Sequence, residues 1–494
     1  MSVHPTRRLA FAAGALALVG LAASCTERPL EPRLEVGAVL ARSVADADGA
    51  GSWLVRFKGN GIPAAFEDKV TSLGGEVIFA HAGAGVAAVA GLDGAGAAQI
   101  RAMGGVAAVD ADASTEIDAI PDFVPEIASS IESPDVPATA LRYDRQWNMH
   151  AIQAKAAWDA GYMGQPTTRV GILDTGIDYL HPDLVGRVDL ALSRSFLSAA
   201  ENQRVQDEFP GAHPIADLNY HGTHVAATVA SNAYIYAGVA SQVTLVGLKV
   251  CAPGTAANGF RGTCPTSGTL AAILYAADNG IPVINMSLGG TFDRRDASAA
   301  GGNGPSFLAT INQVMSYANR NGTLVVVSAG NSALDIDHDG NGYKSYCSAP
   351  LVVCVSATGP TAAASVTGPW TNIDALASYS NFGRSGITVA APGGNAVAVT
   401  AACSGFTVVT SLLACRNRFF NSPTNWSAFT VGLSGTSMAA PHVAGLAALI
   451  AGQVGNNPAQ IRARLQQGAD DLGQPGTDPA YGKGRINVAR TMLN

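Results

Sequence analysis

Three residues of the types that cooperate in nucleophilic catalysis lie at the ends or starts of predicted elements. Asp174 follows an apolar run in GILDTGID, His221 begins HGTHVAATVA, and Ser437 lies in GTSMAAPHVAG. A serine hydroxyl is a weak nucleophile until a base removes its proton. A histidine does this near neutral pH when a buried carboxylate fixes its tautomer. The glycine at 435 leaves room for a substrate beside Ser437. The pattern therefore predicts nucleophilic catalysis by Ser437.

These residues lie in a region, from about residue 143 onward, where strands and helices alternate. Runs rich in Val, Ile and Leu predict strands buried on both faces, at 168–176, 243–250, 281–289, 323–331, 351–358 and 386–393. Helices are predicted between them, at 221–230, 268–280, 305–322 and 436–453. This alternation predicts an α/β domain with a parallel sheet covered by helices and a site at the carboxyl ends of the strands.

A smaller unit precedes that domain. Strands are predicted at 52–57, 75–80, 85–90 and 105–112, with helices at 62–73 and 95–104. The order βαββαβ is the split βαβ arrangement. Residues 114–142 then hold six acidic residues, one basic residue and four prolines, which predicts an extended linker that is accessible to cleavage.

The motifs DTGID, HGTHVA and GTSMAAPHVAG resemble the signature blocks of the subtilisin-like serine proteases, the subtilases, in the Asp-His-Ser order of that family. The resemblance spans residues 143–494 and implies a three-layer subtilisin-like catalytic domain with a parallel sheet between helices. It implies a serine endopeptidase that acts on polypeptides without a catalytic cofactor. Asp174 would orient His221, which would serve as the general base for the nucleophile Ser437.

The same resemblance implies residues for the oxyanion and the substrate. Asn331, in SAGN, would donate its amide to the oxyanion, with the Ser437 backbone N–H as second donor. The segment SLGG would pair with an extended substrate and form one wall of the first specificity pocket. The wall residues would be Ser287, Leu288, Gly289 and Gly290 on one side and Ser328, Ala329 and Gly330 on the other. Small residues on both walls predict an open pocket for bulky apolar side chains.

Residues 51–113 resemble the inhibitory propeptide of the family. The resemblance implies that this domain assists folding, blocks the cleft with its C-terminal tail, and is removed by the enzyme itself. We expect the cut within the acidic, Pro-rich segment 114–142.

The N-terminus predicts export. Arg7 and Arg8 precede the apolar run 9–23, so residues 1–25 read as a signal peptide, followed by a linker at 26–50. Cys25 is a candidate lipoprotein-type lipid anchor, with ordinary cleavage nearby as the alternative. We expect a bacterial protein that is secreted or attached to the cell envelope, and a monomer. The net charge of -7, with no long basic run, argues against nucleic acid as a partner.

The remaining six cysteines fall into three local groups along the chain. An exported protein meets an oxidising compartment, so disulfides are expected. Six cysteines allow about 15 pairings. Proximity in sequence favours Cys251–Cys264, Cys347–Cys354 and Cys403–Cys415.

Two segments are candidate structural calcium sites. DIDHDGNGY resembles the first half of an EF-hand loop, with Asp335, Asp337, Asp339 and Asn341 as ligands. Its twelfth position is Tyr346 rather than Glu, so a solvated acidic turn is the alternative. Asp183, in HPDL, matches a calcium-ligating aspartate of the family.

Other polar residues near the motifs are interpreted as structural: His224, Asp178, His442 and Asn285. No HExxH motif supports a metalloprotease. The carboxyl serine proteases use a glutamate where His221 stands, which argues against that branch. A catalytically silent binding protein on the same fold is the remaining alternative, and the complete set of Asp174, His221, Ser437 and Asn331 argues against it.

Overall fold

The computed structural model describes residues 51–59, 61–117, 126–129, 136–293, 304–338, 340, 342–344, 346–416 and 427–494. The predicted signal peptide, Cys25 and the linker 26–50 lie outside these residues. Asp339 and Asn341 of the predicted calcium loop also lie outside them.

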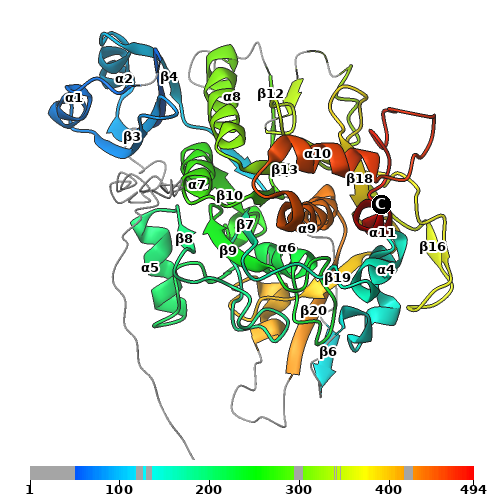
Figure 1. The fold of residues 1–494 in the computed structure, drawn as a ribbon. Coiled ribbons are helices and arrows are strands. Elements are labelled where there is room, and N and C mark those ends of the chain that lie inside the picture. The colour runs from blue at the N-terminus through cyan, green and yellow to red at the C-terminus, as the bar shows by residue number, and fades with distance from the viewer. Residues whose placement is uncertain are drawn as a thin grey trace, which may run out of the picture. The chain divides into compact units, whose positions relative to one another are not determined.

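A seven-stranded parallel sheet forms the centre of the catalytic domain (Figure 1). Its strands, in spatial order, are β18 (Val389–Pro392), β15 (Val353–Thr358), β13 (Leu324–Ser328), β11 (Val283–Met286), β7 (Arg169–Asp174), β9 (Thr244–Lys249) and β8 (Arg194–Ser195). All predicted strands of this domain are present. The chain adds strands on one side of β7 first and then on the other, so the strand order reverses at β7. Parallel sheets bind their ligands at such a reversal, beside the carboxyl ends of the strands, here those of β7, β9, β11 and β13.

Helices cover both faces of the sheet because its strands are apolar on both sides. Leu324 and Val326 of β13 pack into one core, whereas Val325 and Val327 pack into the other. Helices α6 (His221–Val229) and α9 (Thr436–Val454) belong to the first core. Helices α7 (Thr266–Asp278) and α8 (Gly304–Arg320) belong to the second. This is the predicted three-layer arrangement.

Helix α9 is long and apolar enough to span a membrane, by length and composition. Most of it is buried in the core between α6 and the sheet, so it serves as the central helix of the domain. The remaining helices lie around this core: α3 (Trp147–Ala151), α4 (Ala154–Asp159), α5 (Ala199–Glu208), α10 (Pro458–Gln467), α11 (Val488–Leu493) and the 3-10 turns η1 (Pro137–Thr139), η2 (Tyr143–Arg145), η3 (Ala256–Asn258) and η4 (Thr410–Arg416). Ser198, Asn457 and Asn487 cap α5, α10 and α11.

The small N-terminal domain has the predicted order βαββαβ. Its elements are β1 (Gly51–Phe57), α1 (Phe66–Ser72), β2 (Glu76–His81), β3 (Val86–Leu92), α2 (Gly94–Arg101) and β4 (Val106–Ala111). The strands form an antiparallel sheet in the order β2-β3-β1-β4. The domain has a hydrophobic core of its own, which includes Phe57, Phe66 and Ile100.

The segment 114–142, predicted as an extended linker, contains two short strands in its described part. β5 (Ser114–Glu116) pairs with β10 (Thr263–Pro265), and β6 (Glu126–Ser129) pairs with β20 (Ser427–Leu433). β20 also pairs with β19 (Val399–Ala402). These partners lie more than a hundred residues away, so local composition does not reveal them. Two further short pairs are β12 (Thr291–Asp293) with β14 (Gly342–Lys344) and β16 (Ala362–Ala363) with β17 (Trp370–Thr371).

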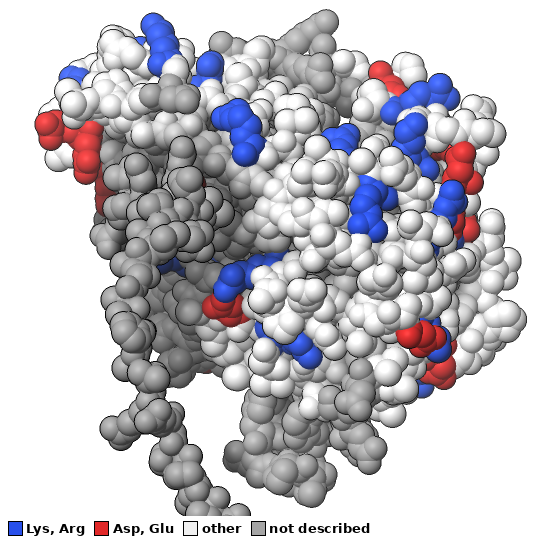
Figure 2. Space-filling model, in the orientation of Figure 1, with Lys and Arg blue, Asp and Glu red and all other residues white. Residues whose placement is uncertain are grey.

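The three predicted disulfides, Cys251–Cys264, Cys347–Cys354 and Cys403–Cys415, are formed. The first of them ties β10 to the segment that follows β9. On the face that Figure 2 shows, charged side chains are scattered among neutral ones. This is the surface expected of a chain with only 14% charged residues.

Candidate active site

Asp174 and His221 form a buried hydrogen-bonded pair. Asp174 is the last residue of β7, and His221 is the first residue of α6. His221 Nδ1 lies 2.8 Å from Asp174 Oδ1 and 3.0 Å from Oδ2, and the two side chains are almost inaccessible to solvent. The carboxylate also accepts the Thr175 backbone N–H at 2.7 Å. This geometry holds the proton on Nδ1 and leaves Nε2 to act as a base.

A second buried carboxylate, Asp217, holds the two segments of this pair together. It accepts the Thr175 hydroxyl at 2.8 Å, and the hydroxyl and N–H of Thr223 at 2.6 and 2.9 Å. Burial raises the pKa of Asp217. The Lys249 ammonium is buried nearby, donates to the Ala216 carbonyl at 2.8 Å, and has its pKa lowered to about 8 by burial.

Sequence reasoning missed Asp217 and Lys249. One signal in the sequence could have revealed them: Lys249 lies in VGLKV, at the end of a strand buried on both faces, where a lysine needs a polar partner.

Ser437 is the second residue of α9, where the helix N-terminus supplies positive potential. Its hydroxyl donates to the Ser287 carbonyl at 3.2 Å. In return, the Ser287 hydroxyl donates to the Ser437 carbonyl at 2.7 Å and accepts from the Asn285 amide at 2.9 Å. The first turn of α9 is therefore fixed against the segment that follows β11.

Asn331 follows β13 and faces the same helix start. Its Oδ1 accepts from the Thr436 backbone N–H at 2.9 Å and from the Thr436 hydroxyl at 2.8 Å. The Gly330 N–H donates to that hydroxyl at 2.9 Å. With the amide oxygen held by Thr436, Nδ2 lies 3.4 Å from where a Cβ would stand at Gly435. The glycine at 435 therefore keeps a side chain away from Nδ2.

A cavity of about 290 Å³ adjoins these groups. Its lining contains the predicted wall residues Ser287, Leu288, Gly289, Gly290, Ser328 and Gly330, together with Asn331, Ser332, Thr436, Ser437, Lys344, Glu116 and Ile117. Ala329 is fully buried, its N–H donates to the Val355 carbonyl, and it is not among the lining residues, so its role in substrate binding stays a prediction. Lys344 and Glu116 are charged lining residues that the prediction of an open pocket for apolar side chains did not include.

The comparisons with known proteins identify the family of the chain. The profile of the subtilase family matches residues 166–484, which is more than half of the chain. The chain belongs to the subtilase family. It is 31% identical to thermitase from Thermoactinomyces vulgaris, over 70% of this chain and 96% of that protein. It is 32% identical to the thermophilic serine proteinase of Bacillus sp. (strain AK1), over 67% of this chain and 63% of that protein.

Solved structures show the same fold. The epidermin leader peptide processing serine protease EpiP from Staphylococcus aureus aligns with a TM-score of 0.64 and 21% identity. That alignment covers 89% of this subtilase and 97% of the EpiP chain. Fervidolysin from Fervidobacterium pennivorans aligns with a TM-score of 0.62 and 22% identity, over 92% of this chain and 63% of its own. The family match and the relatives at 31–32% identity identify the protein as a subtilisin-like serine protease.

In this subtilase the predicted calcium ligands do not converge among the described residues. Asp335 accepts from the His338 ring at 2.8 Å, while Asp337 accepts the backbone N–H groups of Arg384 and Ser385 at 2.6 and 3.1 Å. Within the described part of the chain, no three His, Cys, Asp or Glu side chains gather as a metal site. Calcium binding in this loop stays a prediction.

Asp183 is fully buried and accepts the backbone N–H groups of Ile235 and Tyr236 at 2.9 and 3.3 Å. Burial raises the pKa of its carboxyl to about 6. Its described contacts fix the loop after α6, and a calcium role for it also stays a prediction.

The residues interpreted as structural have structural contacts. His224 lies 3.0 Å from the Val399 carbonyl through Nε2, and burial lowers its pKa to about 3. His442 is buried between the Asn148 amide and the Met438 carbonyl, each 2.8 Å away. Asp178 accepts the Gly405 N–H at 2.9 Å and the Leu180 N–H at 3.1 Å.

Proposed function

We propose that this subtilase is an exported endopeptidase that is made as a precursor and processes itself. The observation that carries the proposal is the path of its own N-terminal segment. β5 runs antiparallel to β10, and the Ile117 N–H then donates to the Gly262 carbonyl at 2.7 Å. Ile117 lines the same cavity as Ser437. The chain thus lies against the active site as a substrate strand would.

Catalysis follows from the described groups. The Ser437 hydroxyl passes its proton to His221 Nε2 as its oxygen attacks the carbonyl carbon of the peptide bond. Asn331 Nδ2 and the Ser437 N–H stabilise the oxyanion. His221 then protonates the leaving amine, which gives an acyl-enzyme, and water activated by His221 releases the acid. Asp174 stabilises the imidazolium throughout.

The contacts of the N-terminal domain support an inhibitory role. The Asp112 carboxylate accepts the Ser267 N–H at 3.1 Å in the first turn of α7, and Asp110 accepts the Ser306 hydroxyl at 2.8 Å in the first turn of α8. Both carboxylates therefore meet positive helix ends.

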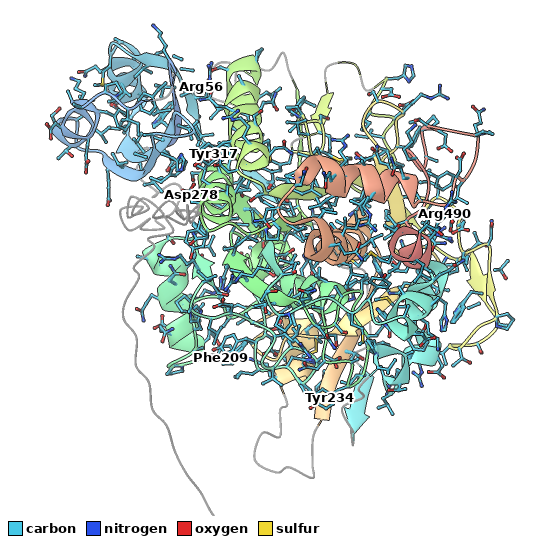
Figure 3. All side chains as sticks on the ribbon, viewed as in Figure 1. Arg56, Phe209, Tyr234, Asp278, Tyr317 and Arg490 are labelled. Carbon is cyan, nitrogen blue, oxygen red and sulfur yellow. A yellow bond between two sulfur atoms is a disulfide. The ribbon has the colours of Figure 1, made fainter. Side chains whose placement is uncertain are left out.

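A third contact lies at Asp278 of α7. It accepts the Tyr317 hydroxyl at 2.7 Å and pairs with the His81 ring at 3.0 Å, as Figure 3 helps to follow. The Tyr317–Asp278 bond lies within the catalytic domain, whereas the His81–Asp278 contact joins it to β2 of the N-terminal domain and supports the proposed inhibitory role.

Export is proposed from the sequence of residues 1–25, and the three disulfides support an oxidising compartment. We propose Cys25 as a candidate lipid anchor, a monomeric enzyme, and structural Ca²⁺ bound by the loop that contains Asp335 and Asp337. Catalysis itself needs no metal in this proposal.

The test is the variant Ser437→Ala. We expect it to accumulate as an uncut precursor, whereas wild type yields a shorter enzyme whose N-terminus lies within 114–142. Normal processing of the variant would show that another protease makes the cut. Processed wild type should also react with a serine-directed organophosphonate. Absence of labelling, or labelling that survives Ser437→Ala, would favour a silent binding protein instead.

A further inference from the structure

Lys344 places a cationic group in the wall of the substrate cavity. It ends β14, and its backbone pairs with Thr291, which follows directly after Gly290 of the SLGG segment. The residue is only 6% exposed, and it lines the cavity together with Ser437 and Asn331. The position of Lys344 is therefore set by a strand attached to the substrate-binding segment.

The ammonium of Lys344 reaches the opposite wall. A Cβ built on Gly330 would collide with Lys344 Nζ and also with the Asn381 amide. Gly330 has a φ of +100°, which only glycine adopts without strain. Nζ therefore lies against the backbone of the segment that ends at Asn331, close to the oxyanion donors.

The catalytic domain contributes one charged side chain to the lining of the cavity in the described structure. Among its lining residues in the described structure, Lys344 is the one cation and Glu116 is the one anion. Glu116 belongs to the N-terminal segment and pairs at 3.6 Å with Arg261. When that segment leaves after processing, the cavity keeps Lys344 and loses Glu116.

The position of the cavity beside Asn331 and Ser437 indicates which residue of a substrate would place its side chain there. Asn331 and Ser437 fix the carbonyl of the bond that is cut, so the side chain of that same residue lies beside them. The adjoining space lies between residues 287–290 and 328–330, and Lys344 borders it.

We propose that Lys344 makes this protease select Asp or Glu as the residue that supplies the carbonyl of the cleaved bond. This inference rests on the proposed endopeptidase function. A carboxylate in the cavity would form a charge-assisted hydrogen bond with the buried ammonium. A neutral side chain would leave that charge without the carboxylate, and a basic side chain would be repelled.

The segment that the enzyme would cut from itself fits this preference. In sequence, the residue after Ile117 is Asp118, which lies outside the described residues, and acidic residues recur through 114–142. The mature N-terminus is therefore expected to follow an acidic residue, which N-terminal sequencing of processed enzyme would reveal.

The main experiment uses processed enzyme and peptide p-nitroanilides that differ only in the last residue: Asp, Glu, Asn, Gln, Leu, Phe or Lys. We expect kcat/KM for the Asp or Glu peptide to exceed that for its amide, Asn or Gln, by about 100-fold, as for other buried charge pairs. Lys344→Met should abolish this advantage and raise the relative rate for Leu. Lys344→Glu should transfer the preference to Lys.

Two controls separate the outcomes. Lys155→Met removes an exposed lysine that pairs with Asp159, and it should leave the preference unchanged. Organophosphonate titration counts active sites in each variant, so loss of folding is distinguished from loss of selectivity. A labelled wild type that prefers Leu or Phe, or a labelled Lys344→Met that keeps the acidic preference, overturns the inference alone. An unlabelled, inactive wild type overturns the proposed function.

Discussion

Thr436 holds the side-chain amide of Asn331 through two hydrogen bonds, one from its backbone N–H and one from its hydroxyl, at 2.9 and 2.8 Å. The Thr436 hydroxyl also accepts the Gly330 N–H. One residue therefore orients the proposed oxyanion donor and fixes one wall of the cavity. Because Thr436 is adjacent to Ser437, the same helix turn positions both the proposed nucleophile and the proposed oxyanion donor.

We predict that Thr436→Val lowers kcat by about 10- to 100-fold with little change in KM. The variant keeps the shape of the side chain but removes the hydroxyl, so the amide of Asn331 is less well directed. Complete loss of an oxyanion donor costs about 10²–10³ in kcat, which sets the upper limit. Steady-state kinetics check this, with Thr436→Ser as the control that retains the hydroxyl. A Thr436→Val enzyme with wild-type kcat would contradict the proposed role.

Asp217 is predicted to be essential for stability. Asp217→Ala removes the acceptor of the Thr175 hydroxyl and of the hydroxyl and N–H of Thr223, all of which are buried. Each buried donor that is left without an acceptor costs about 1–3 kcal/mol. Urea unfolding in the Ser437→Ala background, which prevents autolysis, measures the loss. Asp217→Asn retains one oxygen acceptor and should lose less, and a cost under about 1 kcal/mol for Asp217→Ala would refute the assignment.

The buried His442 is predicted to make the fold sensitive to acid. Burial lowers the pKa of this ring to about 4 from an ordinary 6.5. Between pH 4 and pH 6.5, His442 is therefore protonated in the unfolded chain but neutral in the folded protein. The free energy of unfolding falls as the pH falls below 6.5, because protons then favour the unfolded state.

We expect His442→Asn to lose less stability than wild type between pH 6.5 and pH 4.5. The difference should be about 1.4 kcal/mol per pH unit, the value for one proton. The asparagine amide replaces the donor to the Met438 carbonyl. Urea unfolding at several pH values in the Ser437→Ala background gives the two slopes, and equal slopes would exclude His442 as the titrating group. The ring of His181, whose pKa burial also lowers to about 4, titrates in both proteins.

Chelation tests the proposed calcium site. If the loop that contains Asp335 and Asp337 binds Ca²⁺, excess EDTA removes the stabilisation that binding supplies by mass action, and Tm falls. Asp335→Asn should lower Tm in calcium and respond little to EDTA. An unchanged Tm of wild type in EDTA would mean that this acidic loop is a solvated turn.

Much of the fold was predictable because apolar strands and helix boundaries can be recognised within short stretches of the sequence. The strands of the central sheet are apolar runs that are buried on both faces, and the helices between them begin and end at residues that mark such boundaries. Asp174, His221, Ser437 and Asn331 each lie at a strand end or a helix start, so their motifs already placed them at one edge of the sheet. The sequence by itself determined the fold class and predicted the catalytic residues.

The tertiary structure decided what depends on distant partners. β5 pairs with β10 and β6 with β20, so the predicted linker contains strands whose partners no local pattern identifies. Lys344 lies at the cavity beside Ser437 only because β14 pairs with β12, and Thr436 meets Asn331 only because α9 packs against the end of β13. Strand pairing and helix packing bring these groups together across the chain, whereas residue type and spacing report only on near neighbours.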